Sequence, residues 1–131
     1  AMSLLMLDLD HFKAINDRYG HAAGDKVLRE VTAAWQAQLR GRDPLGRMGG
    51  EEFVVFLPAS TQEQAMRVGQ RVCERVRSAD IVHAASPEGR MTVSIGVASV
   101  QPGDDDVEQM LRRADAALYR AKAAGRNRVS D

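Results

Sequence analysis

The chain has 131 residues, and 44% of them are hydrophobic, which is enough material for one core but not for two. Its 18 basic and 18 acidic residues cancel, so no overall positive field would hold a polymeric nucleic acid by its phosphates. We therefore expect one compact domain over residues 1–131. Any nucleotide ligand should be a small molecule.

Cysteine content and apolar stretches bear on where the protein works. The single cysteine, Cys73, excludes a disulfide framework within the chain and a zinc site with several cysteines. No apolar stretch approaches the roughly 20 residues that span a bilayer. We expect a cytoplasmic chain, with any membrane anchor of the parent protein outside it. Because the first strand begins almost at once, we also expect a domain excised from a larger multidomain protein.

The first third of the chain predicts a strand and a long helix. Residues 3–10, SLLMLDLD, turn acidic at their end, which suits a central strand that delivers carboxylates at its tip. Residues 11–25 hold two glycines and several polar turn formers, and we assign no helix or strand to them. Apolar residues then recur at helical spacing from Val27 to Leu39, which predicts a helix that ends near Arg40.

The middle of the chain predicts a hairpin followed by a second helix. A two-residue link, Gly49-Gly50, supplies the positive φ angles that a tight hairpin turn requires. Residues 53–57, FVVFL, then form the returning strand. Apolar residues spaced from Ala65 to Val76 mark an amphipathic helix.

The last third predicts a strand, a helix and a short closing strand. In residues 91–100, MTVSIGVASV, apolar side chains alternate strictly on one face. A helix should start after residues 104–106, which are all aspartate, and stop at Gly125, before a short strand through Val129. Because a hairpin interrupts the alternation of strands and helices, we predict an α+β fold with a central, mostly antiparallel sheet flanked by helices.

Two pairs of acidic residues stand at the ends of the predicted strands. Asp8 and Asp10 close the first strand, and Glu51 and Glu52 follow the glycine pair in RMGGEEF, residues 47–53. If these strands are neighbours, the carboxylates converge, and close carboxylates are stable only when protonated or bridged by a cation. Such oxygen ligands favour Mg²⁺, which also accepts substrate phosphates. The pattern predicts a phosphoryl or nucleotidyl transfer site, although acids beside a hairpin turn are also often simply solvated.

Three motifs agree in order and spacing with one known family. DLDHFKAINDRYGHAAGD (residues 8–25), RMGGEEF (47–53) and ALYRAKAAGRNRV (117–129) together resemble the GGDEF domain, the diguanylate cyclase family, in its GGEEF spelling. The resemblance runs from Ser3 to Val129. It implies a fold related to adenylyl cyclases and the palm of polymerases. The implied reaction condenses two GTP molecules into cyclic di-GMP and releases two pyrophosphates, within a larger bacterial signalling protein.

The resemblance implies a site for Mg²⁺ or Mn²⁺. Asp8, the carbonyl of Leu9 and Glu51 match the family's metal ligands, and Glu52 would complete a second metal site or help to activate the ribose 3′-hydroxyl. The candidate catalytic residues are thus the three carboxylates in this set. Two cations near the α-phosphate would lower the pKa of the attacking hydroxyl and neutralise the leaving pyrophosphate. For Asp10, a supporting or structural role fits as well as a ligand role.

Two polar residues of the first motif match the positions that bind guanine in the family. The amide of Asn16 would read O6, and the carboxylate of Asp25 would accept hydrogen bonds from N1 and N2. Adenine would leave both groups unsatisfied. The alternative is local, because Asn and Asp among turn formers commonly bond their own backbone.

The triphosphate would occupy a cradle of amides and cations. Backbone amides near Phe12 and Lys13, together with the side chains of Lys122 and Arg126, match the family's phosphate-binding groups. Cations in the last turn of a helix also interact favourably with its dipole, so a purely structural role for the last two stays open.

A second site is implied by RGRD, residues 40–43, which ends shortly before the glycine pair. Arg40 and Asp43 match the family's RxxD inhibitory site for product, and Arg71 matches its secondary arginine. Arginine binds a phosphate or a guanine edge bidentately. Without the spacing to GGEEF, arginines at a helix end would more simply be partners of the helix dipole.

Two functions remain open from the sequence. The first is a diguanylate cyclase with product feedback, which the intact GGEEF favours. The second is a catalytically silent GGDEF module that acts as a cyclic di-GMP receptor or GTP sensor. Since each chain would hold one GTP and the product contains two, the enzyme would need a second GGDEF domain, as a homodimer.

Overall fold

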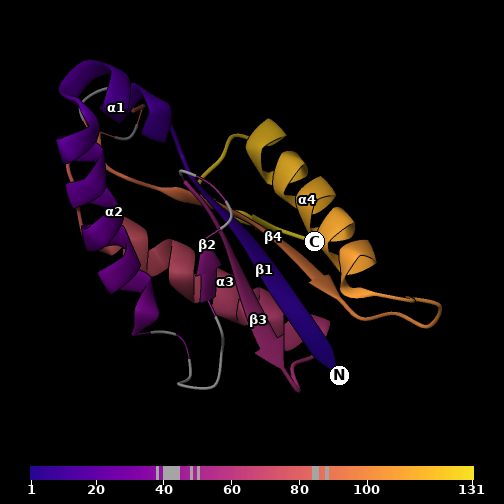
Figure 1. Ribbon diagram of the computed structural model, residues 1–131. Coiled ribbons are helices and arrows are strands. Elements are labelled where there is room, and N and C mark those ends of the chain that lie inside the picture. Colours follow the sequence, from indigo (N-terminus) through magenta and orange to yellow (C-terminus); the bar gives the residue numbers. More distant parts are fainter. Residues whose placement is uncertain (38, 40–44, 48, 50, 84–85, 88) are drawn as a thin grey trace.

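A computed structural model describes residues 1–131 except residues 38, 40–44, 48, 50, 84–85 and 88 (Figure 1). The described residues form one five-stranded sheet and four helices. In chain order these elements are β1 (Met2–Leu9), α1 (Phe12–Tyr19), α2 (His21–Gln36), β2 (Leu45–Arg47), β3 (Glu52–Pro58), α3 (Gln62–Ser78), β4 (Val93–Ser99), α4 (Val107–Ala123) and β5 (Val129–Ser130).

The sheet has the strand order β2-β3-β1-β4-β5. The strand β1 lies at its centre and runs antiparallel to both β3 and β4. The strand β5 pairs parallel with β4, while β2 and β3 are antiparallel. This confirms the predicted α+β fold with a mostly antiparallel sheet.

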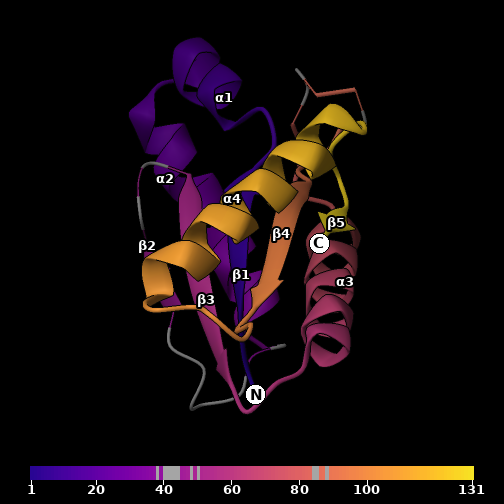
Figure 2. The ribbon, with the colours of Figure 1, turned by 90° about the vertical axis from the view of Figure 1, so that its right-hand side faces the viewer.

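Helices cover both faces of the sheet. In Figure 2, α4 crosses one face, while α2 and α3 lie toward the other. The side chains of β1 divide accordingly: Leu5, Leu7 and Leu9 belong to the core with α1, α2 and α3, and Leu4 and Met6 belong to the core with α4. Because successive strand residues point to opposite faces, a strand covered on both sides is apolar throughout.

Most of residues 11–25, to which the sequence analysis assigned no helix, is helical: α1 covers Phe12–Tyr19, and α2 begins at His21. Phe12 and Ile15 are buried on α1, three residues apart on one helix face. Gly20, with φ 89°, then separates α1 from α2, which begins at His21. The turn formers here mark only the junction between two helices.

The predicted long helix exists, but it begins earlier and ends earlier than its apolar pattern indicates. Its buried side chains include Leu28, Val31 and Trp35, and the Trp35 ring meets Phe53 of β3 edge-on, with 5.0 Å between ring centroids. The helix α2 ends at Gln36, before the predicted end at residue 40, which lies outside the described residues.

The hairpin is confirmed by the pairing of β2 with β3, in which Leu45 lies opposite Val55 and Arg47 opposite Phe53. The predicted two-residue link, Gly49-Gly50, lies partly outside the described residues, because Gly50 is not among them. Glu51, the first acidic residue of the motif, precedes β3, and Glu52 is the first residue of this strand.

The remaining elements follow their sequence signals. A capping box starts α3, since the Thr61 side chain accepts from the Gln64 N–H while the Gln64 side chain accepts from the Thr61 N–H. The Asp106 side chain caps α4 by accepting from the Gln109 N–H, as the run of aspartates predicts. None of the described helices is both long and apolar enough to cross a membrane.

Candidate active site

The end of β1 meets the end of the hairpin. Asp8 of β1 lies opposite Glu52 of β3 in the sheet register. The next backbone amide, of Leu9, donates to the backbone carbonyl of Glu51 over 3.2 Å. The predicted neighbouring strands therefore bring the two acidic motifs to one place, and β1 is the element that positions them.

A pocket of about 170 Å³ opens at this strand tip. It combines acidic groups from β1 and the hairpin with the start of α1 and two cations, one in the last turn of α4 and one just after this helix. Its lining residues are Asp8, Leu9, Asp10, His11, Phe12, Lys13, Glu51, Lys122 and Arg126. Groups from three separate stretches of the chain, each carrying part of a sequence motif, thus share one cavity.

Burial and neighbouring negative charge make the ionised forms of two carboxylates in this site less favourable. Burial raises the pKa of Asp8, and the charge of Asp10 raises it further, while a hydrogen bond and ion pair with the Lys122 ammonium oppose this shift. Burial also raises the pKa of Glu52, followed by the charge of Asp8. Positive charge near these carboxyl groups therefore stabilises their ionised form.

The donor set suits a hard cation with an incomplete protein shell. The described part of the chain holds no group of three or more His, Cys, Asp or Glu side chains that could by themselves bind a metal ion. The pocket offers the carboxylates of Asp8 and Glu51 and the backbone of Leu9. An ion that keeps several waters and takes ligand phosphates, such as Mg²⁺, fits this set better than one that needs an all-protein cage.

The other half of the pocket is suited to an anion. The first amides of a helix have no partner within the helix, so Phe12 and Lys13, which begin α1, present such groups. The N-cap His11 has φ 58°, a left-handed conformation that turns the chain sharply from β1 into α1. Lys122 and Arg126 bring positive charge from the last turn of α4 and the residues after it.

Asp10 makes structural contacts, which favour the supporting role among the alternatives that the sequence left open. Its buried carboxylate accepts hydrogen bonds from Thr92 Oγ1 at 2.7 Å, Ser94 Oγ at 2.6 Å and the Asn127 N–H at 3.0 Å. These contacts tie the end of β1 to β4 and to the loop that carries Arg126. A signal that the sequence analysis did not use was the spacing of Thr92 and Ser94, two hydroxyl residues two positions apart where β4 begins.

The proposed guanine-binding residues lie apart from this pocket, on α1 and α2. Asn16 is half-buried and Asp25 is exposed. A Cβ atom added to Gly24 would lie 1.9 Å from Asn16 Oδ1, so the Asn16 side chain rests directly on the backbone beside Asp25. Because Gly24 has no side chain, it leaves the space that the Asn16 side chain occupies, a role that the sequence analysis did not assign.

The proposed inhibitory site is described only in part. Arg71 is an exposed residue of α3. Arg40 and Asp43 lie outside the described residues. Cys73, by contrast, is buried on α3, and burial raises the pKa of its thiol to about 12, which suits a packing role.

Known proteins are similar to this chain in sequence and in fold. Residues 1–128 match the family described as "Diguanylate cyclase, GGDEF domain". The chain is 43% identical over 129 residues to diguanylate cyclase A of Treponema denticola, covering 98% of this chain and 34% of that protein. It is 41% identical over 127 residues to the uncharacterized protein YhcK of Bacillus subtilis, covering 97% of this chain and 35% of that one. The chain thus spans about a third of the length of these relatives.

Solved structures of GGDEF and GGEEF domains are also similar to this chain. The active GGEEF domain of a diguanylate cyclase from Vibrio cholerae is similar with a TM-score of 0.86 and 35% identity, covering 98% of this chain and 81% of that one. The GGDEF domain of DgcB from Caulobacter crescentus, in complex with c-di-GMP, has a TM-score of 0.88 and 36% identity, with 98% and 76% coverage. From the match over nearly its whole length, this chain belongs to the diguanylate cyclase GGDEF-domain family.

Proposed function

We propose that this chain is a diguanylate cyclase domain that joins two GTP molecules into cyclic di-GMP. In each of two steps a ribose 3′-oxygen bonds to the α-phosphorus of the other nucleotide, the bond to pyrophosphate breaks, and the hydroxyl proton is lost. The observation that carries the proposal is the single pocket that combines carboxylates with the start of α1 and two cations. A triphosphate with its metal ion needs both kinds of group.

The acidic half of the pocket would hold magnesium or manganese. Asp8, Glu51 and the Leu9 carbonyl are the proposed ligands, and Glu52, beside Asp8 in the sheet, would support a second ion or the attacking hydroxyl. The ion would supply charge neutralisation at the α-phosphate and the leaving pyrophosphate. The raised pKa values of Asp8 and Glu52 support the proposal, because a cation would relieve the repulsion behind them.

The cationic half would bind the triphosphate. The amides of Phe12 and Lys13 and the side chains of Lys122 and Arg126 are the proposed contacts. Because Lys122 pairs with Asp8 in the structure, phosphate and carboxylate would share or exchange this ammonium as GTP and the ion bind. Lys122 would thus keep Asp8 ionised until substrate arrives.

Product formation requires two such domains. Each chain would bind one GTP, so two chains would face each other with each 3′-hydroxyl aimed at the opposite α-phosphate. We infer a homodimer in catalysis, and a domain of residues 1–131 that belongs to a larger signalling protein. The rate of product formation should then rise faster than linearly with protein concentration.

The proposed function is tested by incubating the chain with GTP and Mg²⁺ and identifying the nucleotides by mass spectrometry. Cyclic di-GMP should appear, and excess chelator should stop its formation. If cyclic di-GMP and GTP bind but no product forms at any protein concentration, the chain is the alternative, a silent receptor or sensor. The intact acidic motif favours the enzyme.

Gly24→Ala is expected to weaken GTP binding about ten-fold and to reduce discrimination against ATP. The added methyl would displace the Asn16 amide, which we propose reads guanine O6, and a lost hydrogen bond to a buried base costs about 1 kcal/mol or more. Stability should change little, because Ala favours a helix over Gly by about 1 kcal/mol. Calorimetric titration with GTP and ATP measures both affinities.

The Gly24 prediction has an internal check in Asn16→Ala. That variant should lose the same selectivity, and the double variant should lose no more than either single one, because both changes remove one interaction. Additive losses would contradict the proposed link between the glycine and the guanine-binding amide.

Arg40→Ala is expected to weaken cyclic di-GMP binding by roughly ten-fold to a few hundred-fold, since a hydrogen bond to a charged group contributes about 1.5–3 kcal/mol. We propose that Arg40 and Asp43 bind product together with Arg71 of a neighbouring domain, and so hold the domains apart. Arg71→Ala should weaken binding too. Its matched control is Arg67→Ala, an exposed arginine on the same helix that pairs with Glu63. Unchanged affinity in Arg40→Ala would refute the proposed inhibitory site.

A further inference from the structure

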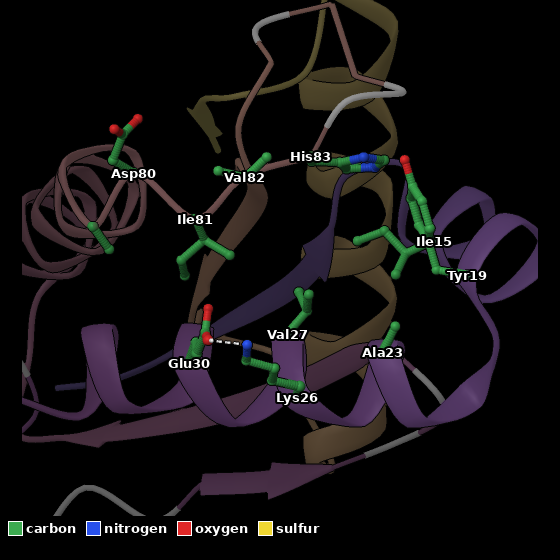
Figure 3. Close-up of a pocket in the computed structure, with 11 residues that line it drawn as sticks. Ile15, Tyr19, Ala23, Lys26, Val27, Glu30, Asp80, Ile81, Val82 and His83 are labelled. Carbon is green, nitrogen blue, oxygen red and sulfur yellow. Dashed lines mark ion pairs between the residues drawn. The ribbon is translucent and has the colours of Figure 1, made fainter.

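His83 is a buried polar residue that none of the roles above uses. It lies between α3 and β4, and its exposed fraction is 1%. Figure 3 shows its ring directed toward Ile15 and Tyr19 of α1, at one end of a cavity of about 400 Å³ between α1, α2 and residues 79–83. The ring of His83 therefore lies between the segment that connects α3 to β4 and the first helix, α1.

The imidazole contacts the backbone of the phosphate-binding segment. His83 Nε2 lies 3.0 Å from the carbonyl oxygen of His11. Because a carbonyl oxygen only accepts, Nε2 must carry the proton and donate it. The other ring nitrogen, Nδ1, is buried and has no hydrogen-bond partner among the described residues. Within the part of the chain that the structure describes, the ring therefore makes one hydrogen bond, to the His11 carbonyl.

The contact holds one peptide group in place. The trans peptide that joins His11 to Phe12 is planar, so its C=O and N–H point in opposite directions. When His83 fixes the direction of the His11 carbonyl, it also directs the Phe12 N–H away from itself. Phe12 lines the pocket at the strand tip. His11 has a left-handed φ of 58°, a conformation that non-glycine residues rarely keep without support.

The support behind His83 is itself fixed by hydrogen bonds. The His83 N–H donates to the Gly89 carbonyl at 3.1 Å, and its carbonyl accepts from the Ser86 N–H at 3.1 Å. The Met91 N–H donates to the Ile81 carbonyl at 2.7 Å. The backbone that carries the imidazole is therefore held in place by hydrogen bonds on both sides of His83.

We propose that His83 is a positioning residue for triphosphate binding: its imidazole orients the His11–Phe12 peptide so that the Phe12 N–H meets a phosphate oxygen. The inference rests on the proposed function, because it takes the pocket at the strand tip to be the triphosphate site. It adds the connection between α3 and β4 to the groups that shape this site. The residue touches neither substrate nor metal.

Two variants at this position separate the hydrogen bond from packing. His83→Gln keeps an amide N–H that can reach the His11 carbonyl, whereas His83→Leu fills the space without a donor. The Leu variant should still fold, because the His11 carbonyl also accepts from the Ala14 N–H at 3.2 Å. If its thermal unfolding shows otherwise, His83→Phe takes its place. Val82→Ala, at an exposed neighbour, is the control.

Calorimetric titration with inorganic triphosphate and, separately, with guanosine, both with Mg²⁺ present, gives the readout. In His83→Leu, affinity for triphosphate should fall about three-fold to ten-fold, as for one lost hydrogen bond. Affinity for guanosine should stay unchanged. His83→Gln should restore triphosphate affinity to within about two-fold of the parent chain, and Val82→Ala should match the parent in both titrations.

The outcomes are distinct from those for the cyclase activity. Four results would each overturn the positioning role. The Leu variant could bind triphosphate as tightly as the parent chain, or lose affinity for guanosine as much as for triphosphate. The Gln variant could bind triphosphate as weakly as the Leu variant, or the parent chain could bind no triphosphate. The parent chain could make no cyclic di-GMP while triphosphate affinity still falls only in the Leu variant. This result would support the positioning role and refute the proposed activity.

Discussion

Glu51→Ala is expected to lower the rate of cyclic di-GMP formation by about a thousand-fold and to leave the fold intact. Glu51 and Asp8 line the same pocket, and we propose that they share one Mg²⁺. An ion in such a site supplies several kcal/mol of transition-state stabilisation, which corresponds to this loss. The backbone carbonyl of Glu51, not its side chain, accepts from the Leu9 N–H, so the strand contact survives the change.

The rate is measured by chromatography of the product at saturating GTP and Mg²⁺, and folding by circular dichroism. Glu108→Ala is the matched control, since Glu108 is exposed at the start of α4, pairs only with Arg112 among the described ion pairs, and lies outside the pocket. It should be as active as the parent chain. An active Glu51→Ala variant, or turnover in excess chelator, would refute the proposed metal site.

Gly96→Ala is expected to lower the free energy of unfolding by about 3 kcal/mol. A Cβ atom at Gly96 of β4 would lie 2.1 Å from the Ala114 carbonyl oxygen and 2.4 Å from the Leu118 nitrogen. Both are backbone atoms of α4, so no side-chain rotation can make room and the helix must move away from the sheet. Since α4 carries Lys122, the proposed phosphate site should be disturbed as well.

Urea unfolding followed by circular dichroism measures this loss, and Gly69→Ala provides the comparison. A Cβ at Gly69, in the middle of α3, would meet the Val129 Cγ2 methyl at 2.8 Å, which is the end of a side chain. Alanine also favours the helix. Gly69→Ala should therefore change stability by less than about 1 kcal/mol. A Gly96→Ala variant as stable as the parent would mean that α4 packs less closely than the structure has it.

Strands and helices with strong periodic patterns could be predicted from the sequence, whereas α1 could not. Residues 11–25 contain turn formers, and local propensity favoured an irregular segment. In the folded chain Phe12 and Ile15 are buried under α2, and this burial stabilises a helix of only eight residues. The hairpin, by contrast, could be predicted, because its apolar returning strand is visible in the sequence pattern.

The family and most of the residues in the pocket can be predicted from the amino-acid sequence, because the acidic pairs, the glycine pair and the basic end of the last helix are local motifs with fixed spacing. How these residues are supported depends on contacts that form only in the folded chain. Asp10 belongs to the same motif as Asp8, yet its carboxylate is taken up by Thr92, Ser94 and Asn127, more than 80 residues away along the chain. Likewise, the contact of His83 with His11 and the close approach of α4 to Gly96 join residues that are far apart in sequence, and no sequence pattern predicts these contacts. Such contacts form only when the sheet brings distant segments together, so a local pattern cannot reveal them.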